Sequence, residues 1–166
     1  MSITAKQVNE LREKTGVGLM DCKKILVETD GNIDQAIQKL REKGLAKAAK
    51  KSDRSTNEGK LFISNTGNEA IILELNCETD FAARTPEFRN LAHDIAMQVV
   101  SMSPTLVGDE DTSSEIADDG SEEIRLLHQK FVKDESTTIQ DLVTEAAAKL
   151  GENIKVKRFS RFELGT

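Results

Sequence analysis

Apolar residues recur with helical spacing through the first part of the chain, in three short groups that turn residues separate. A Thr-x-x-Gln capping pattern at Thr4 opens the first group, and the Gly-Val-Gly break at 16–18 ends it. An Asp-Gly turn at 30–31 leads to Asn32, which caps the third group. The side chains predicted to be buried are Val8, Leu11, Leu19, Cys22, Ile25, Leu26, Ile33, Ala36, Ile37 and Leu40. Residues 1–44 therefore predict a compact three-helix module.

Gly44 is well placed to cap the end of the third helix, and an alanine- and lysine-rich segment follows it. Residues 45–56 contain no turn residue before Ser52, so they predict an exposed helical linker with a basic face. A basic face could also contact RNA or a membrane surface, but a solvated linker needs fewer assumptions. We expect this linker to join the three-helix module to a larger domain.

Between residues 59 and 77 the pattern changes to the alternation that is typical of β-strands. The Asn-Thr-Gly-Asn sequence at 65–68 predicts a turn that joins two strands into a hairpin. The return strand presents a buried face of Ile71, Leu73, Leu75 and Cys77. Residues 154–164 predict a last strand, with Ile154, Val156, Phe162 and Leu164 on its inner face and Lys155, Lys157 and Arg161 on its outer face.

Helical spacing returns between the hairpin and the last strand. Residues 86–102 predict a helix with proline at its first position, and residues 139–150 predict another that Gly151 ends. A third helix is expected near 122–133. The buried stripes are Phe88, Leu91, Ala92, Ile95 and Val99; Ile139, Leu142, Val143, Ala146 and Leu150; and Ile124, Leu127 and Phe131. Residues 57–166 therefore predict a small α+β core domain with an antiparallel sheet, and the whole chain an α+β fold.

Charge is distributed unevenly along the chain, whose net charge is −6. Residues 1–58 hold 12 Lys/Arg and 9 Asp/Glu, whereas residues 59–166 hold 11 and 20. From Asp109 onward, the segment 103–123 carries eight acidic residues and no basic one, which predicts a flexible acidic loop. A basic head on an acidic body argues against general nucleic-acid binding, because that needs a concentrated positive surface.

The residue types that carry out chemistry are few and scattered. Cys22 and Cys77 lie far apart in the sequence on apolar faces, which fits reduced thiols in a core. Together with His93 and His128 they form no metal-ligand or nucleophile–base spacing, and no glycine-rich phosphate loop occurs. We therefore expect no catalytic residue, metal or cofactor. Without a membrane-length apolar run or a signal-peptide pattern, a cytoplasmic protein is expected.

The most distinctive short segment connects the hairpin to the helix that begins at residue 86. It reads Asn-Cys-Glu-Thr-Asp-Phe-Ala-Ala-Arg over residues 76–84, and it places Phe81 in a polar turn. The phenylalanine has two interpretations. It could fold back as a lid on a small core, as large apolar residues usually do. It could instead project as a hydrophobic wedge for a partner, because loops on rigid scaffolds often carry binding residues.

Several motifs, in this order along the chain, resemble the elongation factor Ts family of translation factors. They are Thr15-Gly-Val-Gly-Leu-Met-Asp-Cys-Lys-Lys24, Glu78-Thr-Asp-Phe81, Phe131-Val-Lys-Asp134, Leu150-Gly-Glu-Asn-Ile154 and Arg158-Phe-Ser-Arg-Phe-Glu-Leu-Gly165. The likeness extends over nearly the whole chain except residues 103–123. It implies a guanine-nucleotide exchange factor for elongation factor Tu, a partner bound in its GDP-loaded and nucleotide-free forms.

The resemblance also implies two contact regions. The three-helix module is similar to a ubiquitin-associated domain, and Leu19 and Met20 would supply its hydrophobic contact with the partner. The Thr-Asp-Phe turn would insert near the phosphate side of the nucleotide and disturb the bound Mg²⁺ of the partner. Asp80 would make a polar contact and Phe81 would be the wedge, which makes the wedge the favoured interpretation of that residue.

Thr79 and Ala82 flank the wedge, and Ala82 stands where the family usually has valine. The second core half of larger members is absent, so the resemblance allows a homodimer within a 2:2 complex. No direct contact with nucleic acid or membrane is implied. A ubiquitin-associated-like adaptor without exchange activity is the competing hypothesis, and the Thr-Asp-Phe turn argues against it because an adaptor has no need of such a turn.

Overall fold

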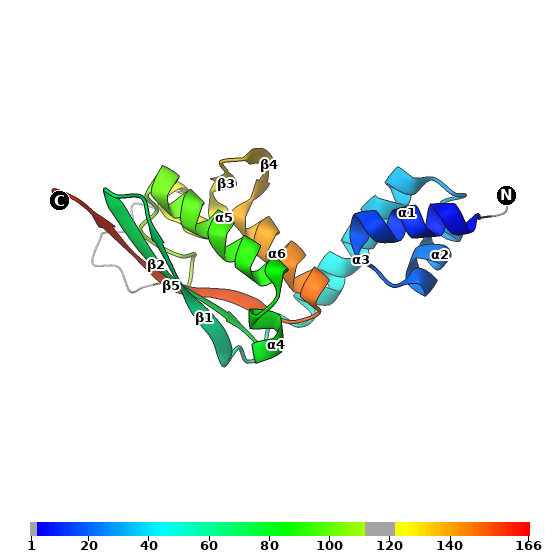
Figure 1. Cartoon of the computed structure of the whole chain (residues 1–166), viewed down its shortest axis with the longest axis horizontal. Coiled ribbons are helices and arrows are strands. Elements are labelled where there is room, and N and C mark those ends of the chain that lie inside the picture. Colours follow the sequence, from blue (N-terminus) through cyan, green and yellow to red (C-terminus); the bar gives the residue numbers. More distant parts are fainter. Residues whose placement is uncertain (1–2, 112–121) are drawn as a thin grey trace.

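The computed structural model describes residues 3–111 and 122–166 and shows an elongated molecule with the two termini at opposite ends (Figure 1). Its elements are α1 (Ala5–Thr15), α2 (Leu19–Glu28), α3 (Ile33–Ala49), β1 (Glu58–Asn65), β2 (Glu69–Cys77), α4 (Asp80–Ala83), α5 (Pro86–Met102), β3 (Lys130–Phe131), β4 (Asp134–Thr138), α6 (Ile139–Leu150) and β5 (Ile154–Glu163), with 3₁₀ turns at Glu122–Ile124 and Leu126–His128. Helices α1–α3 lie at one end and the strands at the other, so the predicted α+β class is confirmed.

Helices α1, α2 and α3 enclose a small core of their own. Its buried members are Leu11, Cys22, Ile25, Leu26 and Ala36. Thr4 forms the predicted capping box at the start of α1, and Asn32 caps α3 by accepting a hydrogen bond from the backbone nitrogen of Gln35. Leu19 departs from the predicted buried stripe, because it is the first residue of α2 and its side chain is 43% exposed.

Gly44 does not end α3, which continues to Ala49, so the predicted cap at this glycine is wrong. The glycine serves close packing instead, because a Cβ atom added there would lie 3.2 Å from the Cβ of Ala148 on α6. The predicted linker is thus helical as far as Ala49 and is the last part of α3. Arg41 of α3 pairs with Glu145 of α6, which adds a polar contact between the two helices.

Among the described residues, the longer strands form an antiparallel sheet in the order β1-β2-β5, and β3 pairs with β4. One face of this sheet packs against α5 and α6 (Figure 1). The predicted inner face of β2 is confirmed, because Ile71, Leu73, Leu75 and Cys77 are fully buried. Both helices that cover this face also have their predicted bounds, since Thr85 caps α5 and Gly151, with a φ of 70°, ends α6.

The inner face of β5 is only partly as predicted. Ile154 and Val156 are buried, whereas Phe162 and Leu164 are exposed. The pairing with β2 moves from Leu75↔Val156 to Glu74↔Arg158, so one extra residue of β5 forms a bulge. A bulge reverses which residues face inward beyond it, and Phe159 and Arg161 therefore lie opposite the buried residues Leu73 and Ile71.

The helix predicted near 122–133 is wrong, because this stretch consists of two 3₁₀ turns followed by β3. Only short turns bond within this stretch, and the rest of its backbone bonds to the segment around Leu106, which forms a parallel bridge with Arg125. The predicted acidic loop is also wrong in its first part, where Leu106 and Val107 are buried in the core. Residues 112–121 of this segment lie outside the described residues.

Candidate functional site

The predicted Thr-Asp-Phe turn is a single helical turn, α4, between β2 and α5. Thr79 is its N-cap, with extended backbone angles (φ −129°, ψ 155°) and a side-chain oxygen that accepts a hydrogen bond from the backbone nitrogen of Ala82. Successive residues of a helix point about 100° apart, so one turn cannot bury all its side chains. Ala82 and Ala83 are buried against the core, and Phe81 lies on the opposite side.

Phe81 is 77% exposed, and the interpretation of this ring as a core lid is therefore wrong. A large apolar side chain gains nothing from solvent, so its projection from a short turn is the feature that a binding role would explain. Asp80 next to it forms an ion pair with Arg84 at 2.9 Å. Both side chains are at least half exposed, and such a pair stabilises the fold by little, which leaves the carboxylate free to exchange partners.

The polar backbone of this turn is held by Glu152, for which the sequence predicted no role, and by Cys77, which the sequence predicted only as a buried thiol. Glu152, which follows Gly151 at the end of α6, accepts hydrogen bonds from the backbone nitrogens of Glu78 (3.1 Å) and Thr79 (3.0 Å). The thiol of Cys77 donates to the carbonyl oxygen of Thr79 at 3.0 Å. Burial raises the pKa of this thiol, and the carboxylate of Glu152 raises it further. The only sequence signal for this segment is the Gly-Glu-Asn sequence at 151–153, which belongs to the family motif Leu150–Ile154.

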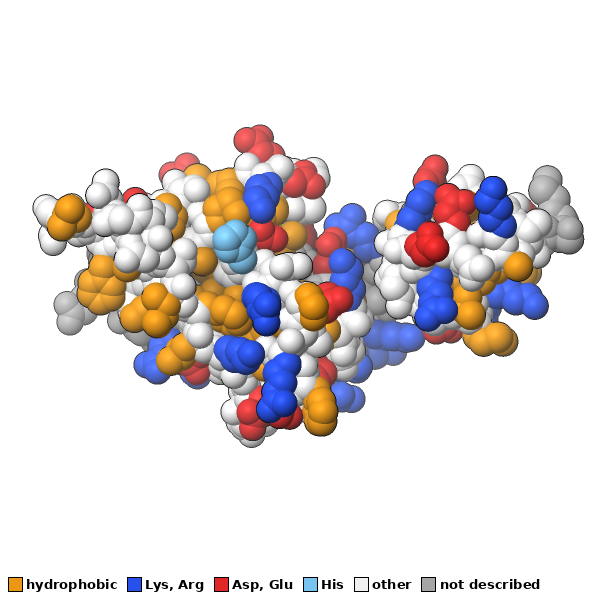
Figure 2. Space-filling view, viewed as in Figure 1, with side chains coloured by type: hydrophobic (Ala, Val, Ile, Leu, Met, Phe, Trp, Pro, Cys, Tyr) orange, Lys and Arg blue, Asp and Glu red, His pale blue; other side chains and the backbone are white. Residues whose placement is uncertain are grey.

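The second predicted contact region lies on α2. Met20 is 78% exposed, as expected for a side chain on the opposite side of the helix from Cys22. Leu19 is partly exposed beside it, and Val27 further along α2 is exposed as well. Figure 2 shows hydrophobic side chains at the surface of both ends of the molecule. Helix α2 thus presents apolar surface to solvent while its other side fills the small core.

The two predicted regions do not meet in the free protein. Helix α2 lies near the N-terminal end of the molecule, and α4 lies beside the lower end of β1, near the middle of the molecule's length (Figure 1). Leu19 and Met20 therefore cannot share one pocket with Thr79–Ala82. A partner that contacts both regions must be large enough to extend from one to the other.

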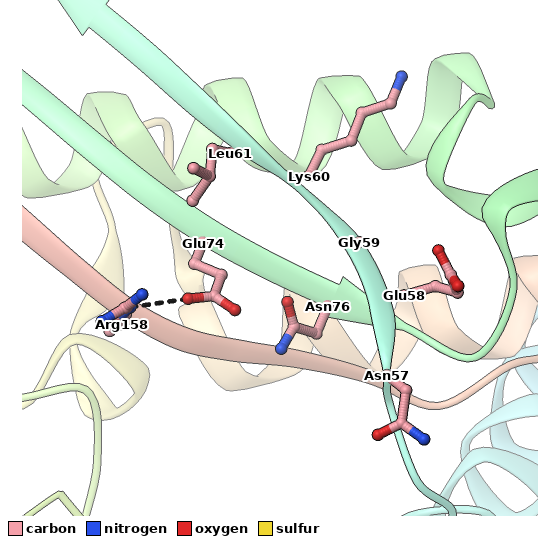
Figure 3. A pocket seen from close by; sticks show the side chains of 8 residues that line it. All are labelled: Asn57, Glu58, Gly59, Lys60, Leu61, Glu74, Asn76 and Arg158. Carbon is pink, nitrogen blue, oxygen red and sulfur yellow. Dashed lines mark hydrogen bonds and ion pairs between the residues drawn. The ribbon is translucent and has the colours of Figure 1, made fainter.

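The outer face of the β1-β2-β5 sheet carries apolar side chains that nothing in the described part of the chain covers. Leu61, Ile63, Ile72 and Phe162 are exposed on β1, β2 and β5, and the register places Ile63 opposite Ile72. A shallow hollow at one end of this face is lined by Asn57, Glu58, Gly59, Lys60, Leu61, Glu74, Asn76 and Arg158 (Figure 3). Figure 3 also shows the ion pair between Glu74 and Arg158, at 2.7 Å.

Two of the charged residues that line this hollow, Glu74 and Arg158, pair with each other. Across residues 3–111 and 122–166, no cluster of three or more His, Cys, Asp or Glu side chains is placed to hold a metal ion. Within the same residues, none of the helices combines the length and the apolar character needed to cross a membrane. The features of the described surface that stand out are therefore apolar: the turn at Phe81, the side of α2 at Met20 and the outer face of the sheet.

Comparison with known proteins gives one consistent family. Residues 119–166 match the family described as Elongation factor TS. The Elongation factor Ts of Herpetosiphon aurantiacus is 46% identical over 197 positions that span 100% of each protein. That of Leptospira biflexa is 44% identical over 99% of each protein, and that of Fervidobacterium nodosum is 41% identical over 99% of this chain and 100% of the relative. The span of 197 positions exceeds the 166 residues of this chain, so the Herpetosiphon protein contains residues that have no counterpart here.

Proposed function

This chain belongs to the elongation factor Ts family, and from that membership we propose that it is a guanine-nucleotide exchange factor for elongation factor Tu in translation elongation. Exchange of this kind needs no reacting group. The factor must bind the nucleotide-free partner more tightly than the GDP-bound partner, and by thermodynamic reciprocity the rebinding of nucleotide then releases the factor. The single observation that carries the proposal beyond membership is the exposed ring of Phe81 on a rigidly attached helical turn.

The turn Thr79–Ala82 is proposed to open the nucleotide site. Phe81 inserts as the wedge, Asp80 makes the polar contact, and the Mg²⁺ site of the partner is disturbed. Burying a phenylalanine side chain contributes about 2–3 kcal/mol. If the ring is buried only when the partner is open, this amount corresponds to one to two orders of magnitude in the rate of GDP release. The 77% exposure of Phe81 in the free protein supports this, because nearly the whole ring is available for burial.

The three-helix module, residues 1–44, is proposed to dock on the partner as a ubiquitin-associated-like domain through Leu19 and Met20. The exposure of Met20 supports this assignment, since burial of that side chain can contribute to binding without loss of the module's own core. Residues 45–56 then form the connection, and the core domain, residues 57–166, carries the wedge. Docking and opening are thus assigned to separate parts of the chain.

A second copy of the chain is proposed to cover the outer face of the sheet, which gives a 2:2 complex with elongation factor Tu. The support is the uncovered apolar surface formed by Leu61, Ile63, Ile72 and Phe162. Two sheets that pack face to face bury such side chains between them. This contact would supply a second core half to a chain of 166 residues, whose alignment with the Herpetosiphon relative spans 197 positions.

Release of labelled GDP from elongation factor Tu, chased with excess unlabelled nucleotide, tests the proposal directly. We expect substoichiometric amounts of the chain to accelerate release, because the factor leaves when nucleotide rebinds. The same measurement rejects the adaptor hypothesis, since an adaptor binds without changing the release rate. An unchanged rate in the presence of a stoichiometric excess of folded chain would overturn the exchange-factor assignment.

A further inference from the structure

The helical turn that carries Phe81 is fastened to the end of α6 by a single carboxylate. The Oε2 atom of Glu152 accepts hydrogen bonds from the backbone nitrogens of Glu78 and Thr79 at 3.1 and 3.0 Å. Its Oε1 atom accepts a hydrogen bond from the hydroxyl of Thr79. Three donors from adjacent residues thus converge on one side chain, and hydrogen bonds to a carboxylate are stronger than those between neutral groups.

Thr79 is fixed at each of its polar atoms. Besides the two bonds to Glu152, its hydroxyl oxygen accepts from the backbone nitrogen of Ala82 at 3.4 Å. Its carbonyl oxygen accepts from the thiol of Cys77 at 3.0 Å and from the backbone nitrogen of Ala83 at 3.4 Å. The N-cap of α4 therefore cannot rotate without breaking several bonds together, and the direction of the next turn is set by its N-cap.

A reciprocal bond extends this attachment toward the N-terminal helices. Glu78 accepts a hydrogen bond from the backbone nitrogen of Asn153 at 2.8 Å. The buried amide of Asn153 donates to the carbonyl oxygens of Ser52 and Arg54, at 2.9 and 2.7 Å, in the segment that follows α3. One continuous set of hydrogen bonds thus runs from the end of α3 to the residue that caps α4.

We propose that Glu152 is a positioning residue for nucleotide exchange, which holds the Phe81 turn in the direction needed for insertion, and that Asn153 joins this turn to the segment after α3. The inference rests on the proposed exchange function. A helix of four residues has no stability of its own, so its orientation must come from tertiary bonds. The exposed ring supplies none of these in the free protein, and the Glu152 carboxylate supplies three.

The Glu152→Gln variant tests whether the turn is positioned by the hydrogen bonds of the Glu152 carboxylate or only by the size of its side chain. Glutamine has nearly the same size but no charge. Its amide nitrogen must face the Thr79 hydroxyl, which then has to accept instead of donate, and the two bonds from backbone nitrogens go to a neutral oxygen and are weaker. GDP release is measured at increasing concentrations of each variant. We expect the maximal rate to fall about tenfold, while the half-saturating concentration changes by less than about twofold because docking through α2 is intact. An unchanged maximal rate would overturn the inference.

A double-variant cycle tests whether Glu152 acts through the ring. In the Phe81→Ala background no ring is left to orient, so adding Glu152→Gln should slow exchange by much less than it does in the unchanged chain, only as far as the Asp80 contact depends on the direction of the turn. Equal fold-losses in both backgrounds would mean that Glu152 acts elsewhere and would overturn the assignment. Asp94→Asn serves as the matched control, because this carboxylate on α5 is paired with Lys133 and does not contact the turn. Its maximal rate should equal that of the unchanged chain.

Hydrogen–deuterium exchange in the free chain gives a readout that needs no partner. The amides of Glu78 and Thr79 donate directly to Glu152, so they should exchange faster in Glu152→Gln, while the amides of β2 keep their protection. Unchanged protection of both amides would overturn the role of Glu152. If the unchanged chain does not accelerate GDP release, the exchange function fails, and the amide rates still decide whether Glu152 orders the turn.

Two further variants keep the inference testable if Glu152→Gln is too unstable to assay. Thr79→Val removes only the hydroxyl bonds, and we expect it to lower the maximal rate about threefold with little effect on half-saturation. Asn153→Asp places acceptors against the carbonyl oxygens of Ser52 and Arg54. We again expect a lower maximal rate with little change in the half-saturating concentration. If Thr79→Val leaves the maximal rate unchanged, the proposal that the attachment to Glu152 positions the turn is overturned. If Asn153→Asp leaves it unchanged, the proposal that Asn153 joins the turn to the segment after α3 is overturned.

Discussion

Phe81 and Phe88 lie on either side of the Thr85 cap and have opposite environments: Phe88 is fully buried, whereas Phe81 is 77% exposed. The ring of Phe88 packs against that of Phe62, with centroids 6.0 Å apart and planes tilted by 47°. The same residue type thus serves the core from the first turn of α5 and projects from α4 a few residues earlier. The two residues form a natural pair for separating stability from function.

The free energy of unfolding of the Phe81→Ala variant should be within about 0.5 kcal/mol of that of the unchanged chain, because an exposed ring leaves no cavity when it is removed. GDP release should slow by one to two orders of magnitude, equivalent to about 2–3 kcal/mol of lost burial in the opened complex. Phe88→Ala should instead lower the free energy of unfolding by about 3–5 kcal/mol. Denaturant unfolding and GDP-release kinetics on both variants check this. A loss of stability in Phe81→Ala as large as that in Phe88→Ala would refute the wedge.

Met20→Asp should weaken docking without unfolding the chain. A charge at this exposed position is harmless in the free protein, but it must be desolvated in the contact. We expect the half-saturating concentration for GDP release to rise about tenfold, with the maximal rate retained. Met102→Asp is the control, since it places the same change on an exposed methionine at the end of α5. If Met20→Asp and Met102→Asp have equal half-saturating concentrations, α2 is not part of the interface.

Ile63→Lys tests the proposed dimer. Ile63 lies on the outer face of the sheet opposite Ile72, and a lysine there would put a charge into the apolar contact between two copies. Sedimentation equilibrium should show a dimer for the unchanged chain and a monomer for Ile63→Lys. Glu87→Lys, an exposed change on α5, should remain a dimer. If the unchanged chain is a monomer at tens of micromolar, the 2:2 arrangement is wrong.

Local sequence signals were sufficient where the chain's own neighbours decide the structure. Thr85 before a proline and Gly151 after an apolar stripe predict the ends of α5 and α6. Alternation predicts the inner face of β2, although Ile72 on the outer face is apolar as well. The exposure of Met20 follows in the same way from its angle to Cys22 on α2. These features depend on residues within one or two turns, and the sequence displays such residues directly.

The errors have a different origin, because they concern partners far away in the chain. The bulge that turns Phe162 outward has no sequence mark, since the extra residue is an ordinary member of an alternating strand. The spacing of Ile124 and Leu127 suits a helix, but the backbone there pairs with Leu106. Glu152 was likewise missed, because its contact with Thr79 spans 73 residues and exists only in the folded core.

Gly59 and Gly67 both have positive φ angles, 152° and 93°, yet they should respond differently to substitution. A Cβ atom added at Gly59 would lie 2.3 Å from the carbonyl oxygen of Leu75, whereas one added at Gly67 would meet no described atom within 4 Å. Gly67→Ala carries only backbone strain of about 1 kcal/mol. Gly59→Ala adds a backbone clash, and we expect a loss of about 3 kcal/mol or more in the free energy of unfolding. Equal losses in urea titrations would contradict the close approach of β1 to β2.

Cys77 should make the stability of the chain fall at alkaline pH. Burial raises the pKa of this thiol, and the charge of Glu152 adds to the rise. A thiol in the unfolded chain ionises near pH 8.5, so above that pH the unfolded state loses its proton while the folded state keeps it. The unfolded state then binds fewer protons than the folded state. The free energy of unfolding therefore decreases as pH rises from about 8, until the pH exceeds the raised pKa of the folded thiol.

Urea unfolding between about pH 7 and pH 10 measures this effect in the unchanged chain, Cys77→Ala and Cys22→Ala. Cys77→Ala should be less stable at pH 7, because a buried side chain is lost from the core under α4. Its stability should nevertheless decline less steeply toward pH 10, since the group responsible for the linkage is gone. Cys22→Ala changes the separate core of the N-terminal helices and should keep the alkaline decline. If Cys77→Ala declines as steeply as the unchanged chain, the alkaline sensitivity does not originate at this thiol.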